Sequence, residues 1–545
     1  MQSLLLLLLL LLAFTGAALE DREHWMNVGR VHLKNILSKQ QNKNLAKNII
    51  IFVGDGMGVA TVTAARIFKG QQQGMVGAEK GSLVWETFPD VGLVKTYNVD
   101  KQVPDSAGTG TAIFTGVKTN LGVVGVDARV AKGKCDATQV RKAELESIFK
   151  WAQASGRLTG FVTTTRVTHA TPSSTYGHTP HREWECNAKV PPEAADCVKD
   201  LARQLVEDEP GRNLRVYNML EQNVLKFLNY FQVIFGGGLS PMGVVNYTGP
   251  DEEVCKRTDG RNLAQEWLLN KERAGLRAKF VQNSGELASV TSENDAVMGL
   301  FATNHMDYDA EREKGSEGSP SLLNMTVTAL RLLKKGPNGF VLMVEGGLID
   351  QAHHLNYARL ALMETVGMEA TVEAVLAMTS RKDTLVIVTA DHSHTMTING
   401  YPARGNDILG MAHNNPKRQP FETLTYANGP AYHQHLNNGT GENLWLDAGQ
   451  MSNRGDPRYM HFAPIWIKSE THGGEDIAVY ATGPFSHLFN GVHEQNYIAH
   501  AASCAGHFGP NAHLCKSSSS SHQVKPLIGL VTLSFMINAF LVKFR

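Results

Sequence analysis

The sequence predicts an α/β protein: a three-layer α/β/α architecture with a central, mostly parallel sheet and one surface insertion. From Asn48 onward, short apolar runs of strand length alternate with amphipathic helical patterns. Near-continuous apolar strands are typical of a parallel sheet that helices cover on both faces. Acidic or histidine-bearing loops follow several of these strands, and the carboxyl ends of such strands are where open α/β sheets bind ligands.

Six apolar runs are predicted strands and four helical patterns accompany them. The strands are expected at Ile49–Val53, Gly160–Thr164, Val233–Phe235, Phe340–Val344, Leu385–Thr389 and Ile477–Ala481. The helices are expected at Ala143–Ala154, Pro192–Glu207, Leu322–Lys335 and Leu360–Thr379. Residues 400–469 are rich in Gly, Asn, Pro and polar residues without a clean period, so we interpret them as a surface insertion near the site.

The composition is that of an ordinary globular protein, with 545 residues, 42% hydrophobic and 19% charged. Lys+Arg and Asp+Glu both number 52, so there is no global basic field. No basic cluster with interleaved aromatic residues occurs either, and we therefore predict no nucleic-acid partner.

Both ends of the chain have the pattern of processing signals. Residues 1–18 contain an unbroken leucine run followed by small residues, which is typical of a secretory signal peptide. Residues 19–46 form a charged arm with helical spacing of its apolar residues, which we expect to pack on another surface, such as a second subunit. Residues 516–545 join a serine-rich spacer to an apolar tail, the pattern of a GPI-attachment signal, and the alternative is a C-terminal transmembrane helix.

An export signal makes disulfides the default state of the six cysteines. Cys504 and Cys515 are close enough in sequence to close a small loop, whereas four others can pair in three ways, namely Cys135, Cys186, Cys197 and Cys255. Acceptor sequons for N-glycosylation occur at Asn246, Asn324 and Asn438.

The first candidate metal set combines a helical pair with a distant histidine. Asp350 and His354 are four residues apart, one helical turn, so both can face one ion. His472 would complete a set of two imidazoles and one carboxylate, the arrangement of catalytic zinc.

A second set consists of Asp391 and His392, adjacent at one strand end, with Asp55 from another strand end. Zinc favours such mixed nitrogen and oxygen ligands. Glu345 and a shared Asp55 supply hard oxygen, and the hydroxyl of Thr171 would extend them to a site suited to magnesium. For any single Asp or His, a helix cap or a satisfied core residue is the simpler alternative.

The candidate nucleophile is Ser106, which lies at the start of a helix of small residues. The free N–H groups and the positive end of a helix bind anions there, although a serine that merely caps the helix is the common alternative. Arg182 offers a planar fork for two phosphate oxygens, with a surface arginine as the alternative. His169 and His394 are predicted to orient ligands rather than to bind metal themselves.

Seven segments together resemble the membrane-anchored alkaline phosphatases of animals, between about residues 47 and 515. They read GDGMG, PDSAGTGTA, THATP, HREW, EGGLIDQAHH, TADHSHT and THGGEDIAV. The resemblance implies two zinc ions and one magnesium ion. One zinc would be held by Asp55, Ser106, Asp391 and His392, and the other by Asp350, His354 and His472. Magnesium would be held by Asp55, Thr171 and Glu345. The resemblance also implies that Ser106 becomes phosphorylated, that Arg182 binds the phosphate and that the protein is a homodimer.

The same resemblance implies the remaining organisation. Residues 47–515 would be the catalytic domain, 400–469 its crown insertion and the N-terminal arm a dimer-clasping helix. The disulfides would join Cys135 to Cys197 and Cys504 to Cys515, leaving Cys186 and Cys255 as an extra pair.

Three positions depart from the mammalian pattern. Thr171 replaces a serine but keeps the hydroxyl, so the magnesium site is expected to persist. Gln351 replaces a histidine outside the ligand set. Ala302 follows Phe301 where an acidic calcium ligand is expected, and no fourth metal is predicted.

The sequence therefore predicts hydrolysis of phosphate monoesters at the cell surface, by two in-line displacements through a phosphoserine. The substrate range should be broad because the predicted contacts grip the phosphate rather than the leaving group. One alternative is a phosphodiesterase, pyrophosphatase or sulfatase of similar fold, which Ser106 and Arg182 disfavour. The other is a catalytically dead, lipid-anchored surface receptor, which the complete set of candidate ligands disfavours.

Overall fold

The computed structural model describes residues 20–75, 77–212, 231–245, 254–412, 420–437 and 444–515. The chain divides into two units, Met1–Asn42 and Lys43–Arg545. In the first unit, helix α2 (Arg22–Leu37) begins at Asp21, whose side chain accepts a hydrogen bond from His24 N, and none of its residues is buried. The predicted signal peptide, the C-terminal tail and the sequons at Asn246 and Asn438 lie outside the described residues.

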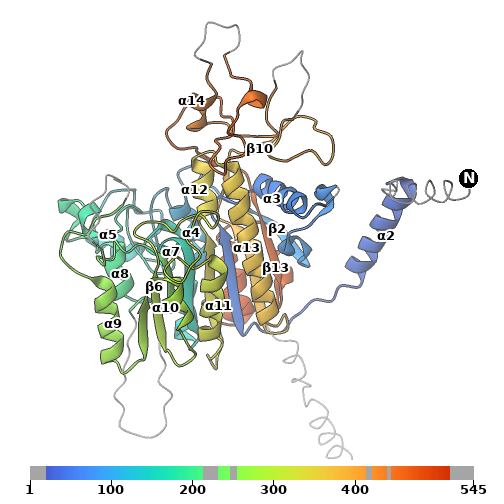
Figure 1. Cartoon of the computed structure of the whole chain (residues 1–545). Coiled ribbons are helices and arrows are strands. Elements are labelled where there is room, and N and C mark those ends of the chain that lie inside the picture. Colours follow the sequence, from blue (N-terminus) through green and yellow to red (C-terminus); the bar gives the residue numbers. More distant parts are fainter. Residues whose placement is uncertain are drawn as a thin grey trace, which may run out of the picture. The chain divides into compact units, whose positions relative to one another are not determined.

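The second unit is built on a ten-stranded sheet with the order β14-β2-β13-β8-β1-β7-β3-β4-β6-β5 (Figure 1). Only β13 is antiparallel to its neighbours, so the mostly parallel sheet is confirmed. The strands are β1 (Asn48–Gly54), β2 (Asp90–Lys95), β3 (Leu158–Arg166), β4 (Phe231–Gly237), β5 (Ala278–Val281), β6 (Ala296–Leu300), β7 (Phe340–Gly346), β8 (Thr384–Ala390), β13 (Ile477–Thr482) and β14 (Gly491–Glu494).

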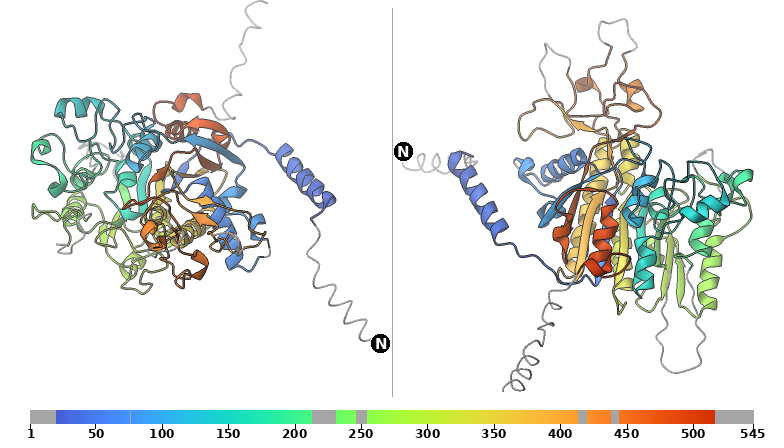
Figure 2. Two further views of the ribbon diagram at one scale, coloured as in Figure 1. Left: turned by 90° about the horizontal axis from the view of Figure 1, so that it is seen from above. Right: turned by 180° about the vertical axis from the view of Figure 1, so that it is seen from behind.

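Two groups of helices cover the sheet, which confirms the three-layer architecture (Figures 1 and 2). Helices α3, α11 and α13 contact one another or the strands β1, β3 and β7, and a second group of α4, α6 and α15 is packed together beside β3 and β7. The longer helices are α3 (Val59–Gln72), α4 (Ser106–Thr115), α9 (Leu263–Arg273), α11 (Leu322–Leu333), α13 (Ala358–Met378) and α15 (Tyr497–Ala505). The shorter ones are α5 (Ala137–Ala143), α6 (Ile148–Ala154), α7 (Ala170–Ser173), α8 (Leu201–Glu207), α10 (Ser284–Ala288), α12 (Leu348–His354) and α14 (Ala431–His435).

The centre of the sheet positions the functional residues. Strand β1 lies between β8 and β7, and its last residue, Gly54, pairs with Ala390 and with Gly346. These three strands are buried along nearly their whole length, as their apolar sequences require in a sheet covered on both faces. Because the strands are parallel, the residues that follow them emerge at one edge.

Two predicted helices are shorter than expected. The helix predicted from Ala143 begins only at Ile148, where Ser147 accepts a hydrogen bond from Lys150 N. The helix predicted from Pro192 begins at Leu201, after Asp200, which accepts from Arg203 N. A side chain that satisfies the first free N–H groups fixes where a helix starts, and this capping overrides the apolar period.

Four strands of the ten-stranded sheet were not predicted, namely β2, β5, β6 and β14. Strand β2 alternates buried and exposed residues along its length, so it lacks the continuous apolar run that identified the others. The region 400–469 contains little regular structure in its described part: β11 (Leu424–Thr425), α14 and a short 3₁₀ turn.

All six cysteines are joined in disulfides, Cys135–Cys197, Cys186–Cys255 and Cys504–Cys515. Asn324, the sequon that the structure describes, is exposed in the first turn of α11. Within the described part of the chain, no helix combines the length and apolarity needed to cross a membrane.

Glu364 on α13 makes the stability of this fold dependent on pH. Burial raises the pKa of Glu364 from 4.5 to about 8, and its Oε1 accepts a hydrogen bond from Asp309 N at 2.7 Å. The folded chain keeps this proton at pH values where the unfolded chain has lost it. The folded state therefore loses stability as pH rises from about 4.5 to about 8. We predict that Glu364→Gln, which keeps the acceptor and removes the charge, stabilises the protein by a few kcal/mol at about pH 9 and little at about pH 5.

Urea unfolding at the two pH values measures this effect. Glu373→Gln, on the exposed side of the same helix, is the matched control and should leave the midpoint unchanged at both. A Glu364→Gln variant that is stabilised equally at acidic and alkaline pH would contradict the prediction.

Candidate active site

Four fully or nearly fully buried carboxylates meet at the carboxyl ends of β1, β7 and β8. Asp55 directly follows β1, Asp391 directly follows β8, and Glu345 is the penultimate residue of β7. Asp350 lies on α12, which begins two residues after β7. The parallel register of the three strands therefore brings together residues that are hundreds of positions apart.

Asp350, His354 and His472 form the first cluster. His354 Nε2 lies 3.3 Å from Asp350 Oδ2, and His472 Nε2 lies 3.3 Å from Asp350 Oδ1. The two Nε2 atoms are also 3.3 Å apart. Helix α12 places Asp350 and His354 on one face, while His472 belongs to β12 (His472–Gly473), which pairs with β9 (Ser393–His394).

The tautomers of both histidines are set by backbone carbonyls. His354 Nδ1 donates to Glu470 O at 2.6 Å, and His472 Nδ1 donates to Pro104 O at 2.8 Å. In the neutral ring, Nε2 is then the unprotonated nitrogen, and it is turned toward Asp350. A ring nitrogen oriented by a hydrogen bond on the other side of the ring is the usual arrangement of a metal-binding histidine.

The spacing of these donor atoms fits a tetrahedral zinc ion. Metal–ligand bonds of about 2.0 to 2.2 Å at tetrahedral angles separate the ligand atoms by roughly 3.3 Å. Without an ion, two unprotonated nitrogens at that separation would repel each other. The side chains of His354 and His472 are 24% and 12% exposed, so this cluster faces the solvent, from which a substrate would arrive.

Asp55, Asp391 and His392 form the second cluster, with Ser106 beside it. His392 Nε2 lies 3.4 Å from Asp55 Oδ1 and 3.3 Å from Asp391 Oδ2. Ser106 Oγ lies 3.1 Å from His392 Nε2 and donates to Asp55 Oδ1 at 3.3 Å. The same donor types and spacing again suit zinc, with the serine hydroxyl in reach of the same position.

The turn after β1 requires glycine. Gly56 has a φ of +70°, in the left-handed region, and a Cβ there would lie 2.5 Å from the ring of His394. Its N–H donates to Asp391 Oδ1 at 3.1 Å. The glycine that follows Asp55 therefore lets the backbone approach the cluster closely and orients one of its carboxylates.

A third group consists of buried oxygens without hydrogen-bond partners among the described residues, namely Asp55 Oδ2, Thr171 Oγ1 and Glu345 Oε1. Asp55, Glu345 and His169 also have donor atoms within 4.8 Å of one another. Buried polar atoms normally have partners, and three oxygens that lack them fit a hard cation such as magnesium. The Thr171 hydroxyl lies at the start of α7, directly after β3 and its turn.

The carboxylates differ in their preferred charge state. Burial, together with Asp350 and Asp391, raises the pKa of Asp55 well above its ordinary value. Burial also raises the pKa of Glu345 to about 7. Although burial opposes it, the charges and hydrogen bonds of His354 and other histidines hold the pKa of Asp350 well below its ordinary value. The surroundings of Asp55, Glu345 and Asp391 therefore lack the positive charge that would let these three carboxylates ionise together.

Ser106 is the first residue of α4, and Asp105 caps the helix by accepting from Gly108 N at 3.2 Å. The serine is thus not the capping residue, and its hydroxyl is free to face the cluster. The small residues of α4 let it pack closely on α7, since a Cβ on Gly110 would lie 2.7 Å from Ser174 Oγ. The sequence analysis noted the small residues of this helix but did not predict their packing role.

Arg182 is held beside the serine from a separate loop. Its Nη1 donates to Asp105 Oδ2 at 3.2 Å, and its Nη2 donates to His169 Nε2 at 3.0 Å. The side chain is 17% exposed. A guanidinium anchored next to the residue that caps the Ser106 helix can reach an anion bound at that helix end.

The two histidines expected to orient ligands have different surroundings. His394 Nε2 lies 2.6 Å from Asp350 Oδ1, and its Nδ1 bonds Glu470. Although burial lowers it, Glu470 and Asp350 raise the pKa of His394 to about 10. His169 contacts Arg182 and belongs to the group around Asp55 and Glu345, so it can also approach the third metal position.

Sequence reasoning missed several residues that the structure brings to the site. Glu470 bonds His394 and both the N–H and the hydroxyl of Thr395, and its position two residues before His472 was the available signal. Thr109 Oγ1 donates to Asp391 Oδ2 at 3.0 Å, one helical turn after Ser106. His305 and Glu185, which both contact Arg166, carry no recognisable sequence signal.

Comparison with known proteins identifies the family. A protein-family model described as alkaline phosphatase matches residues 46–508. Alkaline phosphatase 4 of Drosophila melanogaster is 46% identical over 516 residues, 90% of this chain and 82% of that protein. The membrane-bound alkaline phosphatase of Bombyx mori is 40% identical over 481 residues, 87% of this chain and 82% of that protein. The cold-active alkaline phosphatase of Shewanella sp. superposes with a TM-score of 0.55 at 25% identity, covering 84% of this chain and 99% of that chain. This chain therefore belongs to the alkaline phosphatase family and is a metal-dependent phosphate monoester hydrolase.

Proposed function

We propose that the chain hydrolyses phosphate monoesters through a phosphoserine at Ser106, with two zinc ions and one magnesium ion bound per subunit. The observation that carries the proposal is the position of Ser106 Oγ, 3.1 Å from His392 Nε2 and 3.3 Å from Asp55 Oδ1 at the start of a helix. A serine hydroxyl is a weak nucleophile unless such neighbours activate it.

Each ion has a candidate ligand set among the residues described above. One zinc would be held by Asp350, His354 and His472, and the other by Asp55, Asp391 and His392 with the Ser106 hydroxyl. Asp55, Thr171 and Glu345 would hold magnesium. Ions bound there supply positive charge that lowers the pKa of a coordinated hydroxyl and offsets the charge of the phosphoryl group.

The side chains of the chain itself then define two displacements. Arg182 and the N–H groups at the start of α4 orient the phosphate of the ester. Ser106 Oγ loses its proton and forms a bond to phosphorus as the ester P–O bond breaks, and the leaving alcohol takes up a proton. Water then loses a proton as it attacks the phosphoserine, the Ser106 P–O bond breaks, Ser106 Oγ takes up a proton and inorganic phosphate is released. Because these contacts grip the phosphate, the alcohol is free to vary.

The serine assignment predicts the behaviour of Ser106→Ala. The variant should trap no covalent phosphate after acid quenching of a reaction with a labelled aryl phosphate, and its kcat should fall by about a thousandfold or more because covalent catalysis is lost. Ser503→Ala, a buried serine on α15, is the matched control and should trap phosphate normally. Full activity in Ser106→Ala would refute the phosphoserine mechanism.

The magnesium assignment predicts the metal content of Thr171→Val, which removes the hydroxyl and keeps the shape of the side chain. Elemental analysis after dialysis should show one equivalent of magnesium lost and two equivalents of zinc retained, as the proposed ligand sets require. Thr326→Val, equally buried but on α11, should keep all three ions. Magnesium retained at full occupancy in Thr171→Val would argue against this site.

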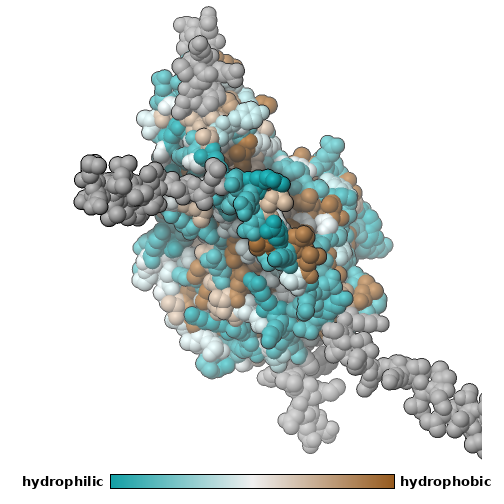
Figure 3. Space-filling model, turned by 90° about the vertical axis from the view of Figure 1, so that its right-hand side faces the viewer, coloured by the Kyte–Doolittle hydropathy of each residue, from teal (hydrophilic) through white to brown (hydrophobic). Residues whose placement is uncertain are grey.

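We further propose that the mature protein is a homodimer. Helix α2 exposes a series of large apolar side chains, Trp25, Met26, Val28, Val31, Leu33, Ile36 and Leu37. The sheet margin formed by β2 and β14 also exposes Val91, Leu93 and Val492. Figure 3 views the side on which β2 and β13 lie in Figure 1 and shows hydrophobic patches among hydrophilic residues. Such patches favour burial against a second copy.

The apolar tail and its serine-rich spacer support a GPI anchor at the outer face of the cell membrane. We predict that phosphatidylinositol-specific phospholipase C releases the activity from membranes of cells that express the full chain, because the enzyme cuts the lipid from its head group. A variant ending at residue 515 should be secreted without treatment. Activity that stays with the membranes after phospholipase treatment would instead favour a transmembrane helix.

A further inference from the structure

A closed circuit of contacts links Arg182 to residues outside the proposed catalytic set. Arg182 Nη2 donates to His169 Nε2 at 3.0 Å, and the ring of His169 packs edge-on against that of His305, with centroids 5.1 Å apart. His305 Nε2 in turn accepts from Arg166 Nη1 at 2.9 Å. The buried Arg166 and the partly buried Arg182 are therefore joined through a pair of imidazoles.

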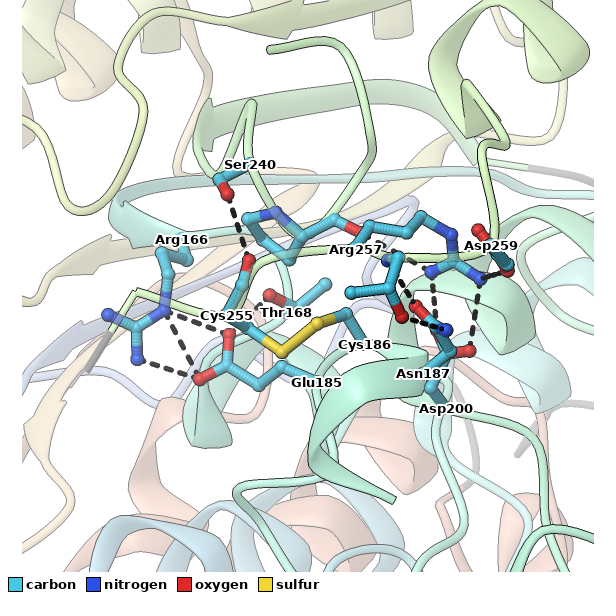
Figure 4. Close-up of a disulfide and its surroundings, with 12 residues drawn as sticks. Arg166, Thr168, Glu185, Cys186, Asn187, Asp200, Ser240, Cys255, Arg257 and Asp259 are labelled. Atoms are coloured by element: carbon cyan, nitrogen blue, oxygen red, sulfur yellow. Dashed lines mark hydrogen bonds and ion pairs between the residues drawn. A yellow bond between two sulfur atoms is a disulfide. The ribbon is translucent and has the colours of Figure 1, made fainter. Parts of the chain in front are cut away.

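Glu185 closes the circuit. Its Oε2 accepts from Arg166 Nε at 2.8 Å, its Oε1 accepts from Arg166 Nη2 at 2.7 Å, and Thr168 Oγ1 donates to the same carboxylate (Figure 4). The side chains of Arg166 and Glu185 are 6% and 5% exposed. Glu185 lies three residues after Arg182, and Arg166 lies three residues before His169. The ion pair thus joins the two segments that supply the guanidinium and its histidine partner.

The segment beyond Glu185 is fastened a second time. Cys186 is bonded to Cys255, and Asn187 exchanges hydrogen bonds with Thr258 (Figure 4). The loop that carries Arg182 is therefore held by the Arg166 ion pair within the circuit and by a covalent link outside it.

Stability alone does not account for this arrangement. A buried ion pair is often no more stabilising than an apolar replacement, because both charges lose their hydration. A bidentate ion pair does restrain the orientation of both side chains. A planar guanidinium must be oriented in this way to bind two oxygens of an anion.

We propose that Glu185 is a positioning residue for phosphate binding: through Arg166 and the adjoining loop, it holds the guanidinium of Arg182 toward Ser106. The inference rests on the proposed role of Arg182. Loss of the Glu185 charge loosens the Arg182 loop and leaves Arg166 without its carboxylate partner, so it weakens the binding of phosphate while the nucleophile and its neighbours are unchanged.

The test uses the metal-loaded, full-length enzyme with inorganic phosphate as the competitive inhibitor. Glu185→Gln should raise the inhibition constant of phosphate by about tenfold, as expected for residues coupled within one network. The KM for an aryl phosphate should rise with it, and kcat should change less. Thr168→Val removes one donor to Glu185 and should shift the inhibition constant less but in the same direction, which provides a test if Glu185→Gln folds poorly.

Asp200→Asn is the matched control. Asp200 pairs with Arg257 at 3.0 Å, and the side chains are 2% and 1% exposed, so the pair is as buried as Arg166–Glu185 and close to the same disulfide. Among the described residues, its side chains have no hydrogen bond or ion pair to Arg166, Glu185 or Arg182, although the helix that Asp200 caps donates to the Glu185 carbonyl through Ala202 N. Asp200→Asn should lower the urea midpoint while the inhibition constant stays unchanged. Equal changes of the inhibition constant in both variants, or none in Glu185→Gln and Thr168→Val, would overturn the proposal.

A double-mutant cycle separates this inference from the proposed function. Arg182→Ala alone should weaken phosphate inhibition, and an unchanged inhibition constant in that variant would refute the role of Arg182 itself. In the Arg182→Ala background, Glu185→Gln should add no further loss, because the two residues act through one interaction. A full additional tenfold loss there would show that Glu185 acts by a route other than Arg182.

Discussion

The mutual repulsion of buried carboxylates is the constraint on which this site depends. Asp55, Glu345, Asp350 and Asp391 are at most 2% exposed and face one another at the end of the sheet. Burial alone disfavours each charge, and every neighbouring charge of the same sign disfavours it further. Histidines favour the charge on Asp350, and cations bound beside Asp55, Glu345 and Asp391 would let those carboxylates ionise as well. The protein is therefore organised to hold positive charge where a phosphate ester is to be bound.

The sheet provides the geometry that this cluster requires. Strands β1, β7 and β8 are adjacent and parallel, so a residue placed at the end of each one meets the others without any long side chain or flexible loop. Their side chains lie in a core that is buried on both faces, which restrains the backbone to which the ligands are attached. Histidines from α12 and β12 then add neutral donors, and each is oriented by a carbonyl on its far side.

Around this rigid centre, the phosphate-binding part is assembled from loops. Arg182 comes from a segment without regular structure, and its position depends on Asp105 at one end and on the circuit through His169, His305 and Arg166 at the other. The Arg182 backbone is anchored by its own N–H, which donates to Gly122 O at 2.9 Å, whereas the direction of the guanidinium depends on these side-chain contacts. The Cys186–Cys255 disulfide also restrains the segment that carries Arg182.

Local sequence patterns were enough to predict much of the secondary structure of this protein. Continuous apolar runs predicted β1, β3, β4, β7, β8 and β13, because a strand that is buried on both faces is apolar at nearly every position. The spacing of Asp350 and His354 predicted a shared helical face in the same way. The helix starts at Ser147 and Asp200 were misjudged because side-chain capping overrides the apolar periodicity of the sequence. Strand β2 was missed because only one of its faces is buried, so it has no continuous apolar run.

Only the tertiary structure decided which distant residues touch. Nothing near Glu185 in the sequence indicates that it accepts three hydrogen bonds from Arg166 and Thr168, and nothing near His305 indicates that its ring packs against His169. A sequence records the period of a single segment, whereas these contacts arise from how segments pack, and packing depends on the shapes of all the side chains between them.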